Sequence, residues 1–398
     1  MPLTTSTLAQ PNLPTKPARR PERPWFSAGP TAKRPGWTPD ALSSALIARG
    51  IRAPTVLART RDAIEMTREV LEVPAGYKLG FIPGSDTGAV EAAFWTMLGG
   101  RRVQVVAYEN FGKIWTTDIL DHLGLDAEVL SAPYGRLPDL SKVDPEADLV
   151  FVWNGTTSGV RVPNADFISK DRKGLTICDA TSAAFAMPLD WDKLDVVTFS
   201  FQKALGGEAG VGVIILSPRA VERIETFTPS WPVPKLYRLK TKDGRLDEDP
   251  FVGCLTNTWS LLTIEDWLDG LRWARREGGL SALIARTDAN FATLAAWVAK
   301  TPWIDFLAED AASRSTTSVC LKFVDPRVAA LSEADAAGFV KRFCNLLEVE
   351  GAALDLAGHR AAPPGLRVWC GCTVDEADVD ALTPWLDWAW AAIQAELG

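Results

Sequence analysis

Histidine is the residue type that this chain most nearly lacks, since its 398 residues include only His122 and His359. Imidazole is a common metal ligand and the commonest general base near neutral pH. Two isolated histidines, with no H-E-x-x-H segment, exclude a histidine-rich metal site or a multi-histidine proton relay. We therefore expect no metal centre. An enzyme built on this chain must use lysine, carboxylates, hydroxyls or an organic cofactor.

Long hydrophobic runs and excess positive charge are also missing. Apolar runs such as Val211–Leu216 (VGVIIL) are far too short to cross a bilayer. The net charge of −8 argues against a general binder of nucleic acid or of anionic membranes. The phosphate-loop pattern G-x-x-x-x-G-K-[ST] is absent, which excludes that class of nucleotide site. We therefore expect neither nucleic acid nor a membrane as a partner.

Cysteine is sparse and scattered. No signal-peptide hydrophobic stretch precedes the six residues, so buried free thiols in a reducing, cytoplasmic compartment are the better interpretation than a disulfide framework. The pair Cys370-Gly-Cys372 lacks the C-x-x-C spacing of redox and zinc sites. The six are Cys178, Cys254, Cys320, Cys344, Cys370 and Cys372.

The first 24 residues carry six prolines, which prevent an amphipathic transit-peptide helix. We predict a disordered or extended arm over 1–24. From about residue 60, short runs rich in Val and Ile alternate with helical segments, which is typical of a mainly parallel sheet covered on both faces. From about Ile264 the pattern changes to long helices with fewer strands, which indicates a smaller α+β domain. The predicted domains are 25–275 and 276–398.

Seven runs are predicted as strands of the large sheet, and they are separated by helices over 60–72, 87–98 and 115–123. In the C-terminal part we predict strands over 318–324 and 365–369, with helices over 264–276, 333–347 and 375–397. The seven strand-like runs cover 77–82, 103–108, 127–130, 149–153, 175–179, 196–201 and 211–216.

Polar side chains follow several of the predicted buried strands. Asp179 ends one strand (LTICD), and Lys203 directly follows another (VVTFSFQK). Ligands of open α/β sheets bind at the carboxyl ends of the strands, where such side chains converge. Pyridoxal phosphate needs this pair, a lysine for its Schiff base and an acid that keeps the pyridine nitrogen protonated. The segments 84–88 (GSDTG), which opens a helix and suits a phosphate, and 154–159 (NGTTSG) add two more polar strand ends.

These motifs resemble those of the phosphoserine aminotransferases, which are fold-type I pyridoxal-phosphate enzymes of the class-V aminotransferase group. The resemblance rests on Ser27-Ala-Gly-Pro-Thr, Asn154-Gly-Thr, Cys178-Asp-Ala-Thr-Ser, Ser200-Phe-Gln-Lys-Ala-Leu-Gly-Gly and Asn257-Thr258. It runs from about Trp25 to the C-terminus. It implies a fold-type I architecture, with a large seven-stranded, mainly parallel sheet domain and a smaller C-terminal α+β domain.

The resemblance also implies roles for individual residues. Lys203 would bind the cofactor covalently, Asp179 would pair with its ring nitrogen, and Thr156 would bond its ring hydroxyl. Phe111 would stack on the ring, where the family often has Trp. Asn257 and Thr258 would reach the phosphate from the partner subunit of a homodimer with shared active sites. The remaining phosphate contacts would come from Ser85, Asp86 and Gln202.

The implied reaction is reversible amino transfer between L-glutamate and 3-phosphohydroxypyruvate, which serves serine biosynthesis; the resemblance extends it to the four-carbon analogue of vitamin B6 synthesis. Arg367 would anchor the α-carboxylate, while His359, Arg360 and Arg52 would contact the distal anion. Ile51 departs from the family, which usually has His before the arginine. This departure leaves open another class-V aminotransferase that acts on a different small or acidic 2-oxo acid. A non-catalytic paralogue is disfavoured because Lys203, Asp179 and Thr156 are all present.

Overall fold

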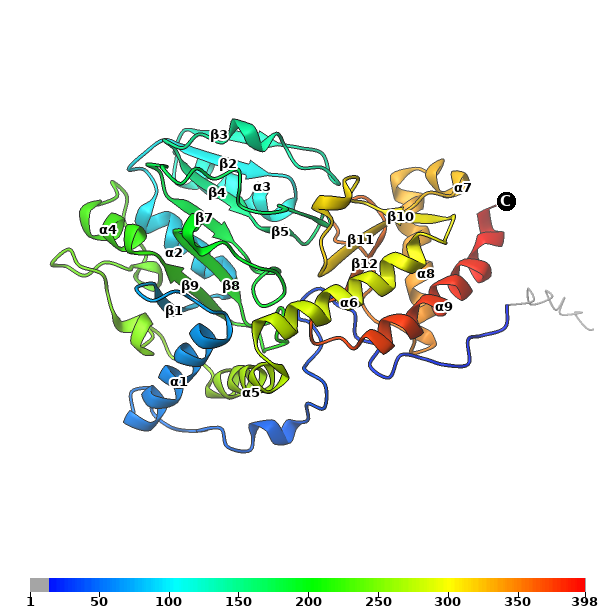
Figure 1. Cartoon of the computed structure of the whole chain (residues 1–398), viewed down its shortest axis with the longest axis horizontal. Helices are drawn as coiled ribbons and strands as arrows, with labels where there is room; N and C mark the ends of the chain where they lie inside the picture. Colours follow the sequence, from blue (N-terminus) through cyan, green and yellow to red (C-terminus); the bar gives the residue numbers. More distant parts are fainter. Residues whose placement is uncertain (1–13, 398) are drawn as a thin grey trace, which may run out of the picture.

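The computed structural model describes residues 14–397, and its larger part is built on a seven-stranded sheet (Figure 1). The strand order is β1-β9-β8-β7-β4-β2-β3, and β9 runs antiparallel to both of its neighbours while the other adjacent pairs are parallel. The mainly parallel seven-stranded sheet is therefore confirmed. Its strands are β1 (Lys78–Pro83), β2 (Val103–Ala107), β3 (Ala127–Ser131), β4 (Asp148–Val152), β7 (Thr176–Asp179), β8 (Val196–Ser200) and β9 (Val211–Leu216).

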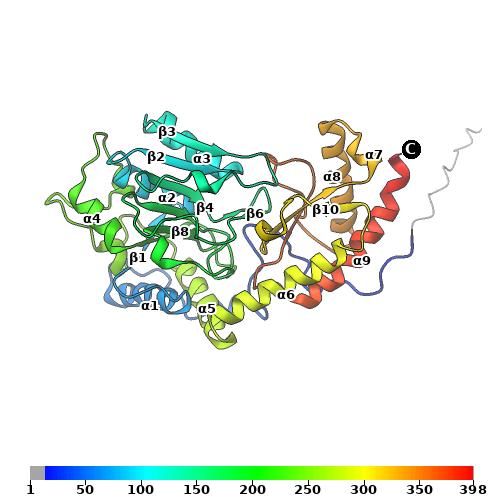
Figure 2. The same cartoon turned by 45° about the horizontal axis from the view of Figure 1, so that its top comes forward.

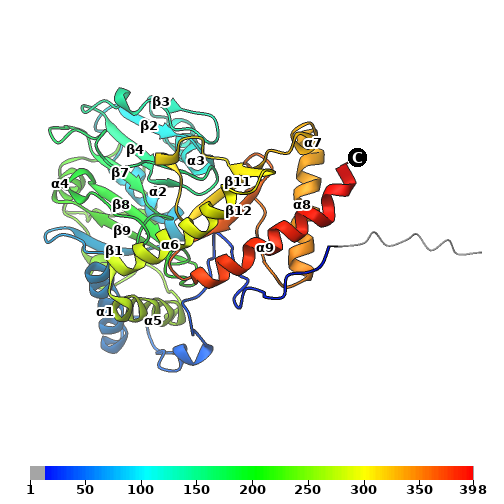
Figure 3. The same cartoon turned by 45° about the vertical axis from the view of Figure 1, so that its right-hand side comes forward.

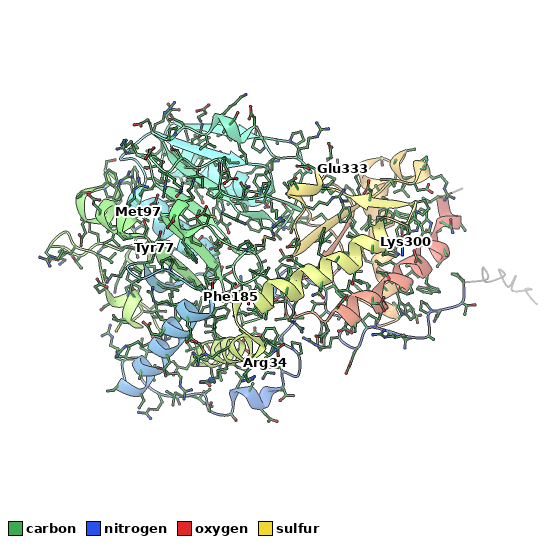
Figure 4. The ribbon with its side chains drawn as sticks, viewed as in Figure 1. Arg34, Tyr77, Met97, Phe185, Lys300 and Glu333 are labelled. Atoms are coloured by element: carbon green, nitrogen blue, oxygen red, sulfur yellow. The ribbon has the colours of Figure 1, made fainter. Side chains whose placement is uncertain are left out.

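Six of the seven strands are buried on both faces, which explains why they read as apolar runs rather than as alternating patterns; the edge strand β3 is half-exposed. Helices α2 (Ser85–Met97), α3 (Asn110–Thr117) and α4 (Pro218–Thr226) cover one face, and α1 (Pro54–Val70) and α5 (Leu261–Glu277) cover the other (Figure 2). Phe185, labelled in Figure 4, packs edge-on against Phe199 of β8 and Trp267 of α5. These aromatic contacts fix α5 against the sheet.

The C-terminal part has its own core around a three-stranded antiparallel sheet, β10 (Ile304–Phe306), β11 (Ser318–Phe323) and β12 (Leu366–Trp369). Its helices are α6 (Leu280–Val298), α7 (Pro326–Ala329), α8 (Glu333–Val349) and α9 (Glu376–Ile393). Figure 3 shows α6 and α9 running beside each other. Strand β10 was not predicted, because three residues are too few to give a periodic signal.

The N-terminal segment from residue 14 lies extended along α9. The indole nitrogens of Trp388 and Trp385 donate to the carbonyls of Pro14 and Arg19, at 3.0 and 2.8 Å. The rest of the predicted arm, 1–13, lies outside the described residues. Within residues 14–397, no helix combines the length and apolarity that a membrane crossing would require.

The helix predicted over 115–123 is in fact split. It begins earlier, at Asn110 in α3, and it continues as a π-helical turn over Asp118–His122. Glu109 accounts for the early start, because its side chain caps the helix by accepting a hydrogen bond from the backbone of Gly112. A hairpin of β5 (Asn154–Gly155) and β6 (Val160–Arg161) also went unpredicted, since two-residue strands leave no pattern.

Candidate active site

The carboxyl ends of β1, β4, β7 and β8 meet at one edge of the large sheet, because only β9 among the central strands runs the other way. A cavity opens at this edge, as expected for an open α/β sheet. It brings together residues that are up to 118 positions apart in the chain. The lining residues are Ser85, Asp86, Thr87, Phe111, Val152, Asn154, Thr156, Asp179, Thr181, Ser182, Ser200, Gln202 and Lys203.

Lys203 follows β8 and turns its amine into the cavity. Its Nζ donates to the carbonyl oxygen of Ala28 at 2.7 Å, so the N-terminal Ser-Ala-Gly-Pro-Thr segment lies directly over it. A Cβ at Gly29 would come within 2.2 Å of that Nζ, so a larger residue there would displace the amine, and the φ of 149° at Gly29 also favours glycine. Burial, followed by the charge of Arg367, lowers the pKa of Lys203 to about 8. A lysine of this kind is neutral often enough near neutral pH to act as a nucleophile and base.

Asp179 is held in a fixed orientation at the end of β7. The indole Nε1 of Trp115 donates to its Oδ2 at 3.1 Å, and the backbone N–H of Thr181 donates to its Oδ1 at 2.9 Å. Sequence reasoning did not single out Trp115. A signal was nevertheless available, because Trp115 lies four residues after Phe111 and hence on the same face of α3.

The first turn of α2 offers free backbone donors to the cavity. Gly84 and Ser85 have positive φ values of 90° and 57°, and both donate their N–H groups to the carbonyl of Gly210. Among the described residues, the N–H groups of Asp86 and Thr87 have no acceptor. An anion at this helix start would find two N–H groups and the positive end of the helix dipole. Ser85 and Asp86 were predicted at this position, whereas Thr87 was not.

Glu109 ties the helix that carries Phe111 to the turn that carries Thr156. Its carboxylate accepts from the N–H of Gly112 and from the hydroxyl of Thr157, each at 2.8 Å. The side chain is fully buried and forms no ion pair within residues 14–397, and this desolvation raises the pKa of Glu109 to about 7. The hydroxyl of Ser318, at the start of β11, completes the arrangement by donating to Thr156 Oγ1 at 3.3 Å.

Replacing Glu109 with glutamine is expected to change how stability depends on pH. The folded-state pKa lies above the usual value, so the contribution of Glu109 to stability is full below about pH 4.5 and is lost as pH rises to about 7. The cost above pH 7 is about 3 kcal/mol. Glu109→Gln should therefore raise the melting temperature of the cofactor-free protein at pH 8 and leave it unchanged at pH 4. Equal shifts at both pH values would contradict this assignment.

Many polar atoms in the cavity are buried without a partner. A buried, unpaired polar atom is costly, so several in one place indicate that a polar ligand completes them. In the described part of the chain, the cavity-lining atoms without any hydrogen-bond partner are Asp86 Oδ1, Asn154 Oδ1, Thr181 Oγ1, Ser200 Oγ and Gln202 Oε1.

Positive charge gathers beside the cavity, although the protein as a whole is acidic. Arg367 projects from β12, and its Nε is buried without a hydrogen-bond partner among residues 14–397. The pKa of His359 is lowered by burial and then by the charges of Arg367, Arg360 and Lys203. The His359 ring also lies 6.2 Å from that of Phe111. An unpaired guanidinium with further cations around it is suited to an anionic ligand.

Six of the predicted site residues do not line this cavity: His359, Arg360 and Arg367 form the charge cluster beside it, and Arg52, Asn257 and Thr258 belong to neither. Arg52 lies near Cys254. Burial raises the pKa of that thiol, and the charge of Arg52 opposes the rise. Asn257 and Thr258 form a local contact, with Asn257 Nδ2 donating to the carbonyl of Thr258 at 3.3 Å. Asn257 Oδ1 is buried and has no partner within the described residues. His122 has no place at the site, and its side chain is exposed on the π-helical turn.

Comparisons with known proteins agree with this geometry. Residues 49–336 match the family model "Aminotransferase class-V". The phosphoserine aminotransferase of Methanosarcina mazei is 50% identical over 380 residues, which cover 95% of this chain and 100% of the relative. Among solved structures, that of a phosphoserine aminotransferase from Cytophaga hutchinsonii superimposes with a TM-score of 0.77 at 21% identity, over 92% of this chain and 99% of that one.

The fold itself is shared by aminotransferases of several specificities. An alanine–glyoxylate aminotransferase from Nostoc superimposes with a TM-score of 0.74 at 20% identity, over 95% of this chain and 97% of that one. Likeness at such identities shows the fold alone, whereas the 50% identity to the Methanosarcina mazei protein extends over nearly the whole length. The chain therefore belongs to the class-V aminotransferase family and, within it, to the phosphoserine aminotransferases.

Proposed function

We propose that this chain is a pyridoxal-phosphate-dependent phosphoserine transaminase, which reversibly exchanges an amino group between L-glutamate and 3-phosphohydroxypyruvate in serine biosynthesis. One observation carries the proposal: Lys203 and Asp179 line one cavity of orphaned polar atoms, beside an arginine whose Nε has no partner within residues 14–397. The family and the Methanosarcina relative support the reaction class and the substrate.

The residues present fit the cofactor. The free N–H groups of Asp86 and Thr87, with the side chains of Ser85 and Gln202, suit its phosphate. Asp179 suits a protonated ring nitrogen. We assign Phe111 to the ring face and Thr156 to the ring hydroxyl, which are contacts of the kind that cofactor enzymes use to orient a reactive ring.

When bound, pyridoxal phosphate accepts the electrons released as the α-carbon of the substrate loses its proton. Lys203 holds and moves that proton, and its lowered pKa suits both directions of the transfer. Arg367 binds the α-carboxylate through paired hydrogen bonds. His359 and Arg360 hold the distal phosphate or carboxylate at the cavity mouth. The charge cluster thus selects substrates with two anionic ends, which glutamate and phosphoserine share.

We infer that a second copy of the chain completes the site in a homodimer. Arg52, Asn257 and Thr258 do not line the cavity of their own chain, and Asn257 Oδ1 has no partner in the described part of the chain. In the homodimer, these residues reach the cofactor phosphate and the distal anion across the interface. We further propose that domain 25–275 holds the cofactor and that domain 276–398 supplies the cationic side chains that bind the substrate. The six free cysteines suit a reducing compartment, and we propose the cytoplasm as the location.

The decisive test is substrate selectivity in a coupled assay with 2-oxoglutarate as acceptor. We expect kcat/KM for phosphoserine to exceed that for alanine, serine and aspartate by about 10³-fold or more. Analogues that lack the phosphate leave the cationic side chains of the site without a partner. Ile51→His, which restores the family's usual residue, serves as the matched variant. Comparable values for alanine or aspartate would assign the protein to a different 2-oxo acid.

A further inference from the structure

One buried acid at the site, Asp86, has a side chain to which no role has been assigned. Asp86 is the second residue of α2, and its side chain is 6% exposed. Only its backbone N–H is needed for an anion at the helix start. Its carboxyl group instead lies among Asp179, Thr181 and Thr198, which are the groups that act on it most strongly after burial itself.

Within residues 14–397 Asp86 forms no ion pair, and its Oδ1 receives no hydrogen bond. The titratable groups that face it are Asp179 and Cys178 of β7, together with Lys203 after β8. Tyr237 lies beside the glycines that flank Asp86. Burial and the charge of Asp179 raise the pKa of Asp86 well above its usual range.

The hydrogen bonds of Asp179 show what a proton on Asp86 would do. Trp115 and Thr181 each donate to one oxygen of Asp179, so that side chain is surrounded by donors, as an anion requires. A second ionised carboxylate beside it would be repelled by Asp179 and also by a phosphate at the start of α2. A protonated Asp86 removes both repulsions and supplies one more donor.

We propose that Asp86 is a positioning residue that carries a proton and donates it in a hydrogen bond to Asp179. The donor stabilises Asp179 as the anion, so the proton shared between Asp179 and the cofactor ring stays on the ring nitrogen. This inference rests on the proposed function only for its effect on the cofactor. The protonation of Asp86 is a property of the chain itself and can be measured without cofactor.

Infrared difference spectroscopy of the cofactor-free protein tests the protonation. At pH 8.5 the C=O stretch of a protonated carboxyl group should appear in the wild type and in Glu109→Gln, and it should be lost in Asp86→Asn. Glu109→Gln is the matched control because it removes a second buried carboxyl group near Asp179, whose pKa burial raises to about 7. A spectrum that Asp86→Asn leaves unchanged would overturn the proposal, whether or not the protein binds pyridoxal phosphate.

A pH titration of the visible band of the holoenzyme tests the positioning role. Asp86→Asn keeps a donor toward Asp179, so its midpoint should match that of the wild type. Asp86→Ala leaves Asp179 with its full charge, and its midpoint should rise by about one pH unit, the value of a hydrogen bond to a charged group. If Asp86 were ionised, removing its charge would instead lower the midpoint in both variants. An unchanged midpoint in both variants would show that Asp86 does not have this role. A wild-type protein with no visible band would contradict the proposed function instead.

Discussion

Replacing Lys203 with alanine is expected to reduce kcat by about 10⁴-fold or more, because the variant loses both the covalent attachment of the cofactor and the base that moves the substrate proton. Lys203 Nζ lies beside Ala28 and near Arg367, and Lys203 is the only lysine among the described residues that line the cavity. Single-turnover absorbance with added pyridoxal phosphate measures the effect directly. The folding control is the melting temperature of the cofactor-free variant. We expect it to be no lower than that of the wild type, since burying an amine costs free energy.

The same variant also tests the shared active site. Mixing Lys203→Ala chains with Asn257→Ala chains should restore about a quarter of the wild-type activity, because half of the dimers are mixed and each mixed dimer holds one intact site. This result requires Asn257 to act across the interface. Two chains that act independently would restore nothing, and significant turnover by Lys203→Ala alone would contradict the catalytic assignment.

Replacing Arg367 with alanine is expected to lower kcat/KM by about 10³-fold while leaving the folded protein at least as stable. The loss follows from leaving a buried substrate carboxylate without its partner. The stability follows because the Nε of the guanidinium is buried and has no hydrogen-bond partner within residues 14–397, and removing it relieves that cost. Steady-state kinetics with phosphoserine and a thermal melt of the cofactor-free protein measure the two effects.

Two variants make the effect of Arg367 specific. Arg367→Lys keeps the charge but loses the planar pair of donors, so its kcat/KM should fall between those of the alanine variant and the wild type. Arg161 is a matched control because its Nε is also buried without a partner in the described residues, yet it lies near Asp288 rather than Lys203. If Arg161→Ala lowered kcat/KM as much as Arg367→Ala does, the loss would reflect general disruption rather than substrate binding.

Most strands of the large sheet could be read from the sequence because they are buried on both faces; the edge strand β3, which is half-exposed, is the exception. All seven strands of the large sheet lie within two residues of the predicted bounds, since continuous Val- and Ile-rich runs have few alternatives. The short strands β5, β6 and β10 went unpredicted because two or three residues carry no period. The early start of α3 was missed because it depends on the cap by Glu109, a contact between a side chain and the backbone.

At the site, the sequence by itself determined the chemical groups, since Lys203, Asp179 and the polar turns stand at strand ends where a parallel sheet must gather them. Only the tertiary structure decided their surroundings. It placed Trp115 on Asp179, Ala28 on Lys203, and near Lys203 also Arg367, whose Nε has no hydrogen-bond partner within residues 14–397. The physical reason is the separation along the chain of the residues that interact. Strand formation depends on the local pattern of side chains, whereas burial, orientation and pKa depend on contacts between residues far apart in the chain.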